Sequence, residues 1–587
     1  MDWALKRDLQ AQLAEERGYY LFPAGTRTRL ALIYPNSYFV GMSNLGLHVV
    51  YDLLNRRDDT ACERAFLPDR QTWPRYVRTR TPLMTVETQT PLSEFPLLAF
   101  VLSFEMDYFH VLDILAQSHV PLRASARGER DALIIAGGPC ATFNPEPLAG
   151  VVDAFIIGEG EAIMPAFMDA YQAGVQAGED RRALLRRLAQ VPGVYAPSLY
   201  TVTYHDDGTV QAITPATAAV PAQVERQYVH DLDAWPAHTV VVTDNTEFNF
   251  YLIETARGCG RHCRFCMAGY CFRVPRNRSL AVVEQEVRAA LPYGKKVGLM
   301  GAAISDYPEV NALCQYILGQ GLTMSVASFR ADSVTPELVE ALAASGLQTL
   351  TLAPEAGTSR MRDIINKGIE EEHLFHSIDL GVAAGIRNFR LYIMVGLPYE
   401  EEADVDGIID LANRVKDYME AHGARGTLTL SVNPFIPKPF TPFQWLPMGE
   451  RKLVTKRLKR LEQALRKRKQ VIVNIESPKE SYVQGVLARG DRRVGEALLR
   501  AQELAMAAGD NAARAGSGAK QFKRAMKESR LAAEFYLYRE RTAEEIFPWE
   551  HLAMGFRKEY LQRELDKAGK EEFTPRCFDG CHRCGVC

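Results

Sequence analysis

The feature that most constrains the fold is the alternation of apolar strand patterns with helical patterns, which occurs in two series along the chain. In the first series, apolar runs at 28–35, 97–104, 131–138 and 152–161 are separated by helical stretches such as 44–55. Buried strands that alternate with helices predict a parallel sheet covered by helices. Ligands bind such sheets at the carboxyl ends of the strands, and two of these runs end in Gly-rich turns there.

The second series begins near residue 250 and contains five further strand patterns. They span residues 296–305, 323–330, 349–357, 388–398 and 427–437. Six parallel strands with helices outside predict a full or partial β/α barrel. Catalytic groups of such barrels lie at the carboxyl ends of the strands, so the turns after these runs are the candidate site.

The two series divide the chain into several domains, as its 587 residues lead us to expect. We expect an N-terminal helix (1–27), a Rossmann-like α/β domain (28–214), a linker (215–248), a partial barrel (249–450), a mostly helical C-terminal domain (451–576) and a Cys-rich tail (577–587). A small hairpin is predicted at 201–213, around Asp207-Gly208. The linker contains three prolines and little periodicity.

The composition is that of an ordinary globular protein, with 47% hydrophobic and 24% charged residues. The net charge of -3 argues against wholesale attraction to nucleic acids or membranes. The apolar run 95–104 is too short to span a bilayer, and the first twenty residues lack a secretory apolar core. We therefore expect a cytoplasmic protein. In that reducing compartment the tight grouping of seven of the 11 cysteines indicates metal ligands rather than disulfides.

The first cysteine group follows the first barrel strand and consists of Cys259, Cys263 and Cys266 in a C-x3-C-x2-C spacing. The alternative is that the three cysteines are part of a zinc site. A closed zinc site needs four ligands, however, and no fourth ligand is nearby in the sequence. Three thiolates on a four-iron cluster leave one iron open. The spacing therefore favours a cluster with a free position for a substrate or cofactor.

This loop, with Phe265 before its last cysteine, resembles the signature of the radical S-adenosylmethionine (SAM) enzymes. The turns "GAAISDYP", "SFRADS", "APEAGTSRMR" and "MVGLP" resemble that superfamily's cofactor-binding motifs and occur in the same order. The resemblance implies that the three cysteines hold a [4Fe–4S] cluster whose fourth iron chelates the amino and carboxylate groups of SAM. One electron from the cluster would then cleave a carbon–sulfur bond of SAM.

The resemblance also implies a set of SAM-binding residues. Gly301, Ala302 and Ala303 would let the methionine part lie against the backbone, Ser328, Arg330 and Glu355 would reach its polar groups, and Met394, Gly396, Leu397 and Pro398 would flank the adenine. For Glu355 the alternative is a solvated carboxylate at a strand end.

The first domain resembles the cobalamin-binding domain of class B radical SAM enzymes in the stretches 34–55, 136–147 and 153–161. The implied cobalamin site contains Asn36, Ser37, Gly41, Ser103, Gly137, Gly138, Gly158, Glu159 and Gly160. The Asp-x-His-x-x-Gly motif that supplies a histidine to cobalt elsewhere is absent, and we interpret His48 and Cys140 as packed side chains. The order of all parts resembles one poorly characterised bacterial family of B12-binding-domain radical SAM proteins with a C-terminal Cys cluster.

The second cysteine group is Cys577, Cys581, Cys584 and Cys587, in a C-x3-C-x2-C-x2-C spacing. Four thiolates this close can wrap one [4Fe–4S] cluster or hold tetrahedral zinc. A metal-free tail is the third possibility, but Gly580 and Gly585 would let the chain turn tightly round a metal. We favour an auxiliary [4Fe–4S] cluster, with zinc as the alternative.

The stretch 451–470 contains ten Lys or Arg residues and one acidic residue, Glu462. On a helix this forms a positive stripe, which is either a solvated face or a track for RNA phosphates.

The function that we expect is reductive cleavage of SAM with cobalamin-dependent methyl transfer to an unactivated carbon or phosphorus. Sulfur insertion or methylthiolation of RNA or protein with the auxiliary cluster is one alternative, and a non-catalytic iron–sulfur or cobalamin carrier is another. The partners would be an electron donor such as a flavodoxin or ferredoxin and a substrate that is a small molecule, RNA or protein. No membrane partner is expected.

Overall fold

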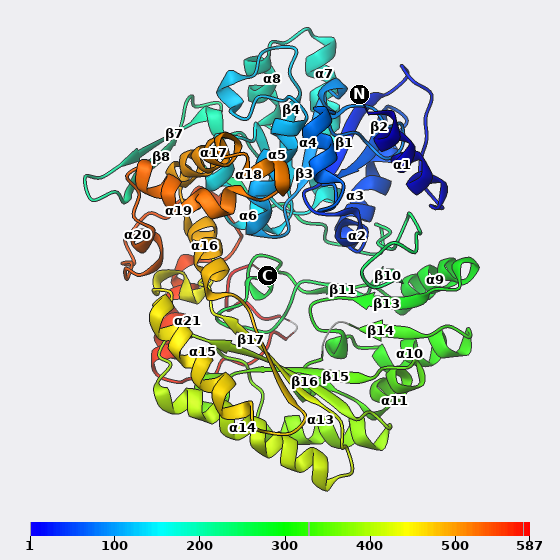
Figure 1. Cartoon of the computed structure of the whole chain (residues 1–587), viewed down its shortest axis with the longest axis vertical. Coiled ribbons are helices and arrows are strands. Elements are labelled where there is room, and N and C mark those ends of the chain that lie inside the picture. Colours follow the sequence, from blue (N-terminus) through cyan, green and yellow to red (C-terminus); the bar gives the residue numbers. More distant parts are fainter. Residues whose placement is uncertain (1, 327–328, 579, 587) are drawn as a thin grey trace.

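The computed structural model describes residues 2–326, 329–578 and 580–586, and its N-terminal domain is built on one sheet (Figure 1). Its strands are β1 (Thr28–Tyr34), β2 (Thr60–Phe66), β3 (Leu97–Val101), β4 (Leu133–Gly137), β5 (Ala154–Ile156) and β6 (Val194–Tyr195). The spatial order is β2-β1-β3-β4-β5-β6, parallel except for β6 against β5. The first five strands have the flavodoxin-like order, so the α/β prediction is confirmed and the switch point lies between β1 and β3.

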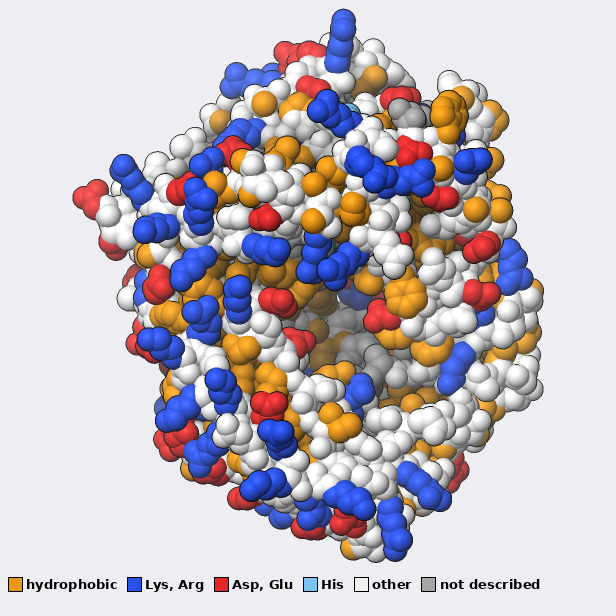
Figure 2. Space-filling model, viewed as in Figure 1, with side chains coloured by type: hydrophobic (Ala, Val, Ile, Leu, Met, Phe, Trp, Pro, Cys, Tyr) orange, Lys and Arg blue, Asp and Glu red, His pale blue; other side chains and the backbone are white. Residues whose placement is uncertain are grey.

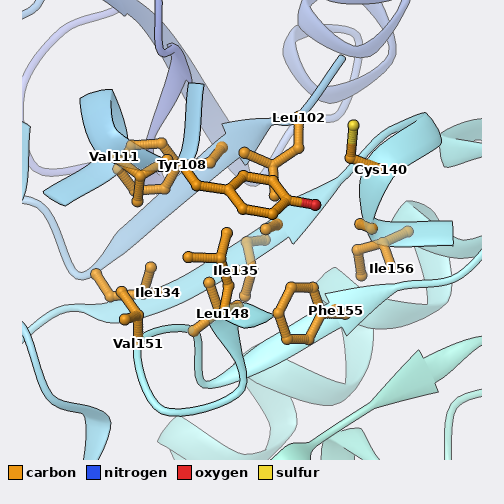
Figure 3. Packing of buried hydrophobic residues seen from close by; sticks show 14 of the residues in the cluster. Leu102, Tyr108, Val111, Ile134, Ile135, Cys140, Leu148, Val151, Phe155 and Ile156 are labelled. Carbon is orange, nitrogen blue, oxygen red and sulfur yellow. The ribbon is translucent and has the colours of Figure 1, made fainter. Parts of the chain in front are cut away.

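Helices and a hairpin complete this domain. They are α1 (Trp3–Ala14), α2 (Tyr38–Gly41), α3 (Leu45–Asn55), α4 (Trp73–Thr79), α5 (Tyr108–Gln117), α6 (Pro139–Phe143), α7 (Gly160–Gln176), α8 (Arg181–Leu188) and the pair β7 (Tyr200–Tyr204) and β8 (Val210–Pro215). Figure 3 shows the Tyr108 ring of α5 among Leu102, Ile135 and Phe155, with its hydroxyl on the side of Cys140. Cys140 is buried in this core, as expected for a packed side chain.

Strand β2 was missing from the sequence-based prediction, because its apolar pattern is interrupted by Glu63 and Arg64. Both side chains are buried and paired: Arg29 contacts Glu63 at 2.8 Å, and Arg64 contacts Glu16 and Glu87. Charged residues become compatible with a buried position in a strand only when such partners satisfy them.

The second domain is a partial barrel of parallel strands. One sheet holds β10 (Phe250–Glu254), β13 (Lys296–Met300) and β14 (Met324–Val326), and the other holds β15 (Thr349–Glu355), β16 (Asn388–Val395), β17 (Leu428–Pro434) and β18 (Val471–Ile475). A parallel bridge between Phe329 and Leu352 joins the two sheets. The covering helices are α9 (Leu280–Ala290), α10 (Val310–Gly319), α11 (Pro336–Ala344), α12 (Ser359–Ile364), α13 (Glu371–Ala383), α14 (Glu402–Ala421) and α15 (Arg451–Leu465).

The boundary expected after residue 450 is wrong, because the barrel continues through α15 and β18. Strand β18 pairs in parallel with β17 along five residues, so α15 is a crossover helix of the barrel. The strand is short, and its residues alternate between half-buried and exposed. A five-residue edge strand behind a strongly charged helix carries too weak a pattern to be recognised from sequence.

The positive stripe of α15 is partly neutralised by acidic residues of α14 and of the turn before it. Arg457 pairs with Glu400 at 2.8 Å and with Glu402 at 2.9 Å, and Arg460 pairs with Asp406 at 2.6 Å. Lys456 remains exposed. Ion pairing across the two helices favours the interpretation as a solvated face over an RNA track.

The remaining helices are shared between the two domains: the last of them packs on α12 of the barrel, and most of the others pack on the N-terminal domain. They are α16 (Pro478–Arg489), α17 (Arg492–Ala507), α18 (Asp510–Ala513), α19 (Gly518–Glu528), α20 (Ala533–Leu537) and α21 (Lys558–Gly569). Figure 1 shows α17 to α19, in orange, against that domain, and one hydrophobic core includes residues of both. Gln502 of α17 donates to the buried Asp113 at 2.7 Å. β9 (Val224–Glu225), in the segment expected as a linker, pairs with β19 (Leu552–Ala553). Among the described residues, no helix is both long and apolar enough to cross a membrane.

Candidate active site

The first cysteine group lies in the loop that connects the two strands of a small antiparallel ribbon. Strands β11 (Ala256–Arg257) and β12 (Arg276–Asn277) form the ribbon, and the loop between them carries Cys259, Cys263 and Cys266. Gly258 opens the loop with φ = +81°, where an added Cβ would lie 2.2 Å from the Phe272 carbonyl oxygen. Only glycine fits there, so the turn that presents the cysteines depends on it.

The three thiols are partly or fully shielded from solvent and influence one another. Cys263 is buried, and Cys259 and Cys266 are half-buried. Burial raises the pKa of Cys259, and it raises the pKa of Cys266 to about 12, with the neighbouring cysteines adding to both shifts. Metal binding replaces these protons. Within the described ranges no three His, Cys, Asp or Glu side chains are placed to hold a single metal ion. Cys259, Cys263 and Cys266 are the residues that would hold a four-iron cluster, which spreads its thiolates wider than a single ion does.

Charged side chains lie around the cysteine loop at the carboxyl ends of the barrel strands. Arg261, inside the loop, donates to Asp306 at 2.7 Å and to Asp332 at 2.7 Å. Arg330 donates to Asp332 at 3.0 Å and to the Lys367 carbonyl oxygen at 2.7 Å. Of these, only Arg330 was predicted from sequence. The others follow different strands, so their convergence could not be recognised from the chain order.

Glu355 ends β15 in an unusual conformation. Its φ is +66°, and its carboxylate accepts from the Lys367 ammonium at 3.0 Å. A non-glycine residue in the left-handed region costs about 1–3 kcal/mol, and such residues concentrate at functional sites. The pair of buried Lys367 and half-buried Glu355 offers both charges that the amino and carboxylate groups of an amino acid would need.

The other expected SAM residues are distributed as follows. Gly301 and Ala302 line the main cavity of the protein, whereas Ala303 does not. Met394 and Leu397 pack in a small apolar cluster, and Pro398 is half-buried. Ser328 lies outside the described residues. Gly396 has φ = +86°, and its N–H donates to Glu400 at 2.9 Å. Sequence reasoning missed Glu400, which follows the same turn directly.

The main cavity lies between the two domains and has a volume of about 560 Å³. Its first wall comes from the carboxyl ends of β1, β3, β4 and β5 with the first turns of α3 and α7, and its second wall comes from β10, the cysteine loop and the turn after β13. Figure 2 shows that the molecular face is hollowed between these two domains. The cavity thus joins the flavodoxin-like switch region to the cysteine loop.

The expected cobalamin residues fall into two groups. Ser103, Gly137, Gly138, Gly158, Glu159 and Gly160 line the cavity, whereas Asn36, Ser37 and Gly41 do not. Asn36 donates to Asp107 at 3.1 Å, Ser37 caps α2, and Gly41 packs so closely on Phe66 that an added Cβ would lie 2.5 Å from its ring. These three positions shape the N-terminal domain beside the cavity and are not part of its wall.

Glu159 is held in an ion-pair network that joins the domains. Its carboxylate contacts Arg257 at 2.9 Å and Arg276 at 2.6 Å, on the two ribbon strands that carry the cysteine loop. Glu161 contacts Arg257 at 2.7 Å, and the Val229 N–H donates to Glu159 at 3.0 Å. We call Glu159, Glu161, Arg257 and Arg276 the interdomain clamp. It fixes the Gly-rich turn of the first domain against the base of the cysteine loop.

The fold and the cysteine loop define a protein with a flavodoxin-like domain joined to a SAM-type barrel. Residues 253–412 match the family model of the radical SAM superfamily, and residues 46–197 match that of the N-terminal part of radical SAM proteins. The chain belongs to the radical SAM superfamily. The superfamily implies a [4Fe–4S] cluster, SAM and a source of electrons.

Relatives extend over most of the chain. An uncharacterized protein of Methanocaldococcus jannaschii is 29% identical over 472 residues, which are 80% of this chain and 90% of the relative. A putative methylthiotransferase of the same organism is 22% identical over 310 residues, 50% of this chain and 60% of the relative. The radical SAM methyltransferase TsrM of Kitasatospora setae, solved with cobalamin and a [4Fe–4S] cluster, is 15% identical with a TM-score of 0.42, over 69% of this chain and 72% of that one.

Proposed function

We propose that this radical SAM enzyme depends on cobalamin and transfers a methyl group to an unactivated carbon or phosphorus. The observation that carries the proposal is the cavity between the flavodoxin-like switch region and the cysteine loop. A ligand in this cavity would lie against both domains at once. Such a position suits a group carrier that must face SAM on one side.

The wall formed by the first domain suits a broad, flat ligand. Gly138 has φ = +99° and Gly158 has φ = +129°, and an added Cβ would lie within 2.8 Å and 2.0 Å of neighbouring carbonyl oxygens. These turns therefore present backbone, and the side chains of Val49, Val101 and Met164 add apolar surface. Among the cavity-lining residues that the structure describes, none is a histidine, so cobalt would lack a histidine ligand from this wall. Bound cobalamin would supply a methyl carrier.

The second wall would position SAM. Cys259, Cys263 and Cys266 would hold the cluster, which supplies the electron for cleavage of a carbon–sulfur bond. The Glu355 carboxylate and the Lys367 ammonium would orient the charged groups of the methionine part. Gly301 and Ala302 line the cavity and leave room for the ligand beside the backbone.

A graded substitution at Gly137 tests the cobalamin site. Its φ is not in the left-handed region, and an added Cβ would meet only Ile156 at 3.5 Å, so Gly137→Ala fits. Gly137→Leu places a branched side chain at the cavity wall. After anaerobic reconstitution and desalting, we expect the wild type and Gly137→Ala to retain the cobalamin absorption spectrum and Gly137→Leu to lose it. Iron content and circular dichroism serve as folding controls. Equal retention by all three proteins, or by none, contradicts the proposal.

Methylthiolation of RNA or protein is the second candidate function. It is favoured by the similarity to a putative methylthiotransferase and by the thiols of the C-terminal tail. The two candidates differ in their dependence on cobalamin and in the sulfur content of the product. A product that gains sulfur, formed at an equal rate by Gly137→Leu and wild type, supports the second candidate.

A further inference from the structure

The C-terminal tail folds back onto the loop that carries the first cysteine group. The Cys577 N–H donates to the Gly260 carbonyl oxygen at 2.8 Å, and an added Cβ on Gly260 would lie 3.4 Å from the Cβ of Cys577. Gly260 directly follows Cys259 in the chain. One residue and one hydrogen bond therefore separate a ligand position of the first cluster from the first thiol of the tail.

Guanidinium groups are directed at the three described thiols of the tail. One nitrogen of Arg273 contacts the Cys577 sulfur at 3.2 Å and the Cys584 sulfur at 3.4 Å. Arg583 contacts the Cys581 sulfur at 3.2 Å. Because a single nitrogen reaches both Cys577 and Cys584, these two thiols face the same point.

Arg273 needs a negative partner, and the tail is the available one. Its side chain is 1% exposed, and within the described ranges no carboxylate forms an ion pair with it. Its remaining hydrogen bonds go to the backbone of Gly269 and Arg261 and to His262. A buried cation without a counter-charge strongly destabilises the fold. Thiolates, or a negatively charged cluster held by them, remove that cost.

Hydrogen bonds hold the tail in place both before Cys577 and at Cys584. Asn366 donates to the Thr574 carbonyl oxygen at 3.0 Å and accepts from the Thr574 N–H at 2.7 Å. The Arg557 N–H donates to the Cys584 carbonyl oxygen at 3.0 Å. Cys581 and Cys584 are buried. These contacts favour a built site over a metal-free solvated tail.

We propose that Cys577, Cys581 and Cys584 hold a second [4Fe–4S] cluster, beside the first, which passes electrons to it. Cys587, the fourth cysteine of the motif, lies outside the described residues. A cluster on these cysteines would accept one electron from a low-potential donor and supply it to the cluster held by Cys259, Cys263 and Cys266. The electron would serve the reductive cleavage of one carbon–sulfur bond of SAM, so the donor would be oxidised by one electron for each SAM cleaved and both clusters would end oxidised. Zinc has no redox chemistry, so it could not serve at this position.

Iron content tests the ligands. We expect about eight irons per wild-type chain and about four in each of Cys263→Ala and Cys581→Ala, because each variant loses one cluster. Cys584→Ala should match Cys581→Ala. Phe578→Ala, on the same tail but with a side chain that is 66% exposed, should keep the full iron content. Zinc in place of iron in wild type, or unchanged iron in both tail variants, overturns the proposal.

Electron paramagnetic resonance tests the proximity without requiring substrate turnover. In the fully reduced wild type, the two neighbouring clusters should couple magnetically and give a broadened spectrum. Cys263→Ala and Cys581→Ala should each give an uncoupled signal from one cluster. With a protein electron donor, SAM cleavage by Cys581→Ala should fall at least tenfold, while the signal of its barrel cluster with SAM persists. A wild-type spectrum equal to the sum of the two variants' spectra, or unchanged cleavage, contradicts the relay. Neither result depends on cobalamin.

Discussion

Replacement of Glu159 by Gln should weaken the interdomain clamp, which holds the Gly-rich turn of the first domain against the base of the cysteine loop. Glu159 is 7% exposed and contacts both strands of the ribbon. Gln keeps the shape but removes the charge. Arg257 retains Glu161 and Glu254 as partners, whereas Arg276 has no other carboxylate among the described ion pairs.

The expected cost follows from that asymmetry. Removal of one partner from a buried ion pair costs about 3–5 kcal/mol. Since only Arg276 loses its sole carboxylate, we expect a value near the lower end, about 3 kcal/mol. Each 1.4 kcal/mol is a factor of ten, so the open population of the clamp should rise roughly a hundredfold.

Hydrogen–deuterium exchange measures this opening directly. Peptides that cover residues 225–230 and 256–277 should lose up to about a hundredfold in protection in Glu159→Gln. Glu225→Gln is the matched control, because Glu225 lies on neighbouring β9 with an exposed side chain. Protection within threefold of this control in Glu159→Gln would refute the assignment of the clamp.

The clamp should also respond to acid. Burial alone would raise the pKa of Glu159, but the hydrogen bond from Arg276 and the charge of Arg257 outweigh it and hold the pKa below its ordinary value. A lowered carboxylate pKa stabilises the fold above the unfolded pKa of about 4.3, and this contribution disappears as pH falls through the lower folded value. In the wild type, hydrogen-exchange protection of these peptides, corrected for intrinsic exchange, should therefore stay level from about pH 5 to 8 and decrease below about pH 4. In Glu159→Gln the titration of this carboxylate is absent, so it should contribute no such decrease.

Three further substitutions test the metal and SAM sites. Cys263→Ala should abolish 5'-deoxyadenosine formation, because two thiolates cannot hold the barrel cluster. Cys314 is buried on α10, away from the loop in sequence, and Cys314→Ala should retain this activity. SAM cleavage by Cys263→Ala at the wild-type rate would overturn the ligand assignment. Glu355→Gln should weaken SAM binding about tenfold in a calorimetric titration, because it removes the charge opposite Lys367; an unchanged Kd would exclude Glu355 from the SAM site. Arg273→Met should lower the reduction potential of the tail cluster in a redox titration, because it removes a cation and hydrogen bonds from the sulfurs; a raised potential would contradict that geometry.

The sequence by itself determined the two α/β series and the cysteine triad. Both are written in local patterns: apolar runs of strand length, helical periodicity, and thiols spaced within one loop. The turns after β13, β15 and β16 could be recognised for the same reason. Each motif occupies a few consecutive residues, so its meaning does not depend on knowing what packs against it.

Tertiary structure alone decided which distant groups meet. Glu159 could be predicted to lie at a strand end, but its carboxylate faces Arg276 of the other domain. Helices α17 to α19 cover the N-terminal domain, and the tail reaches Gly260. A hydrophobic pattern predicts which face of a helix or strand is buried, but it does not identify the element that packs against that face. A charged residue is predicted to lie on the surface unless its buried partner is known. For that reason β2, the clamp and the contact between the two cysteine groups appear only in the folded chain.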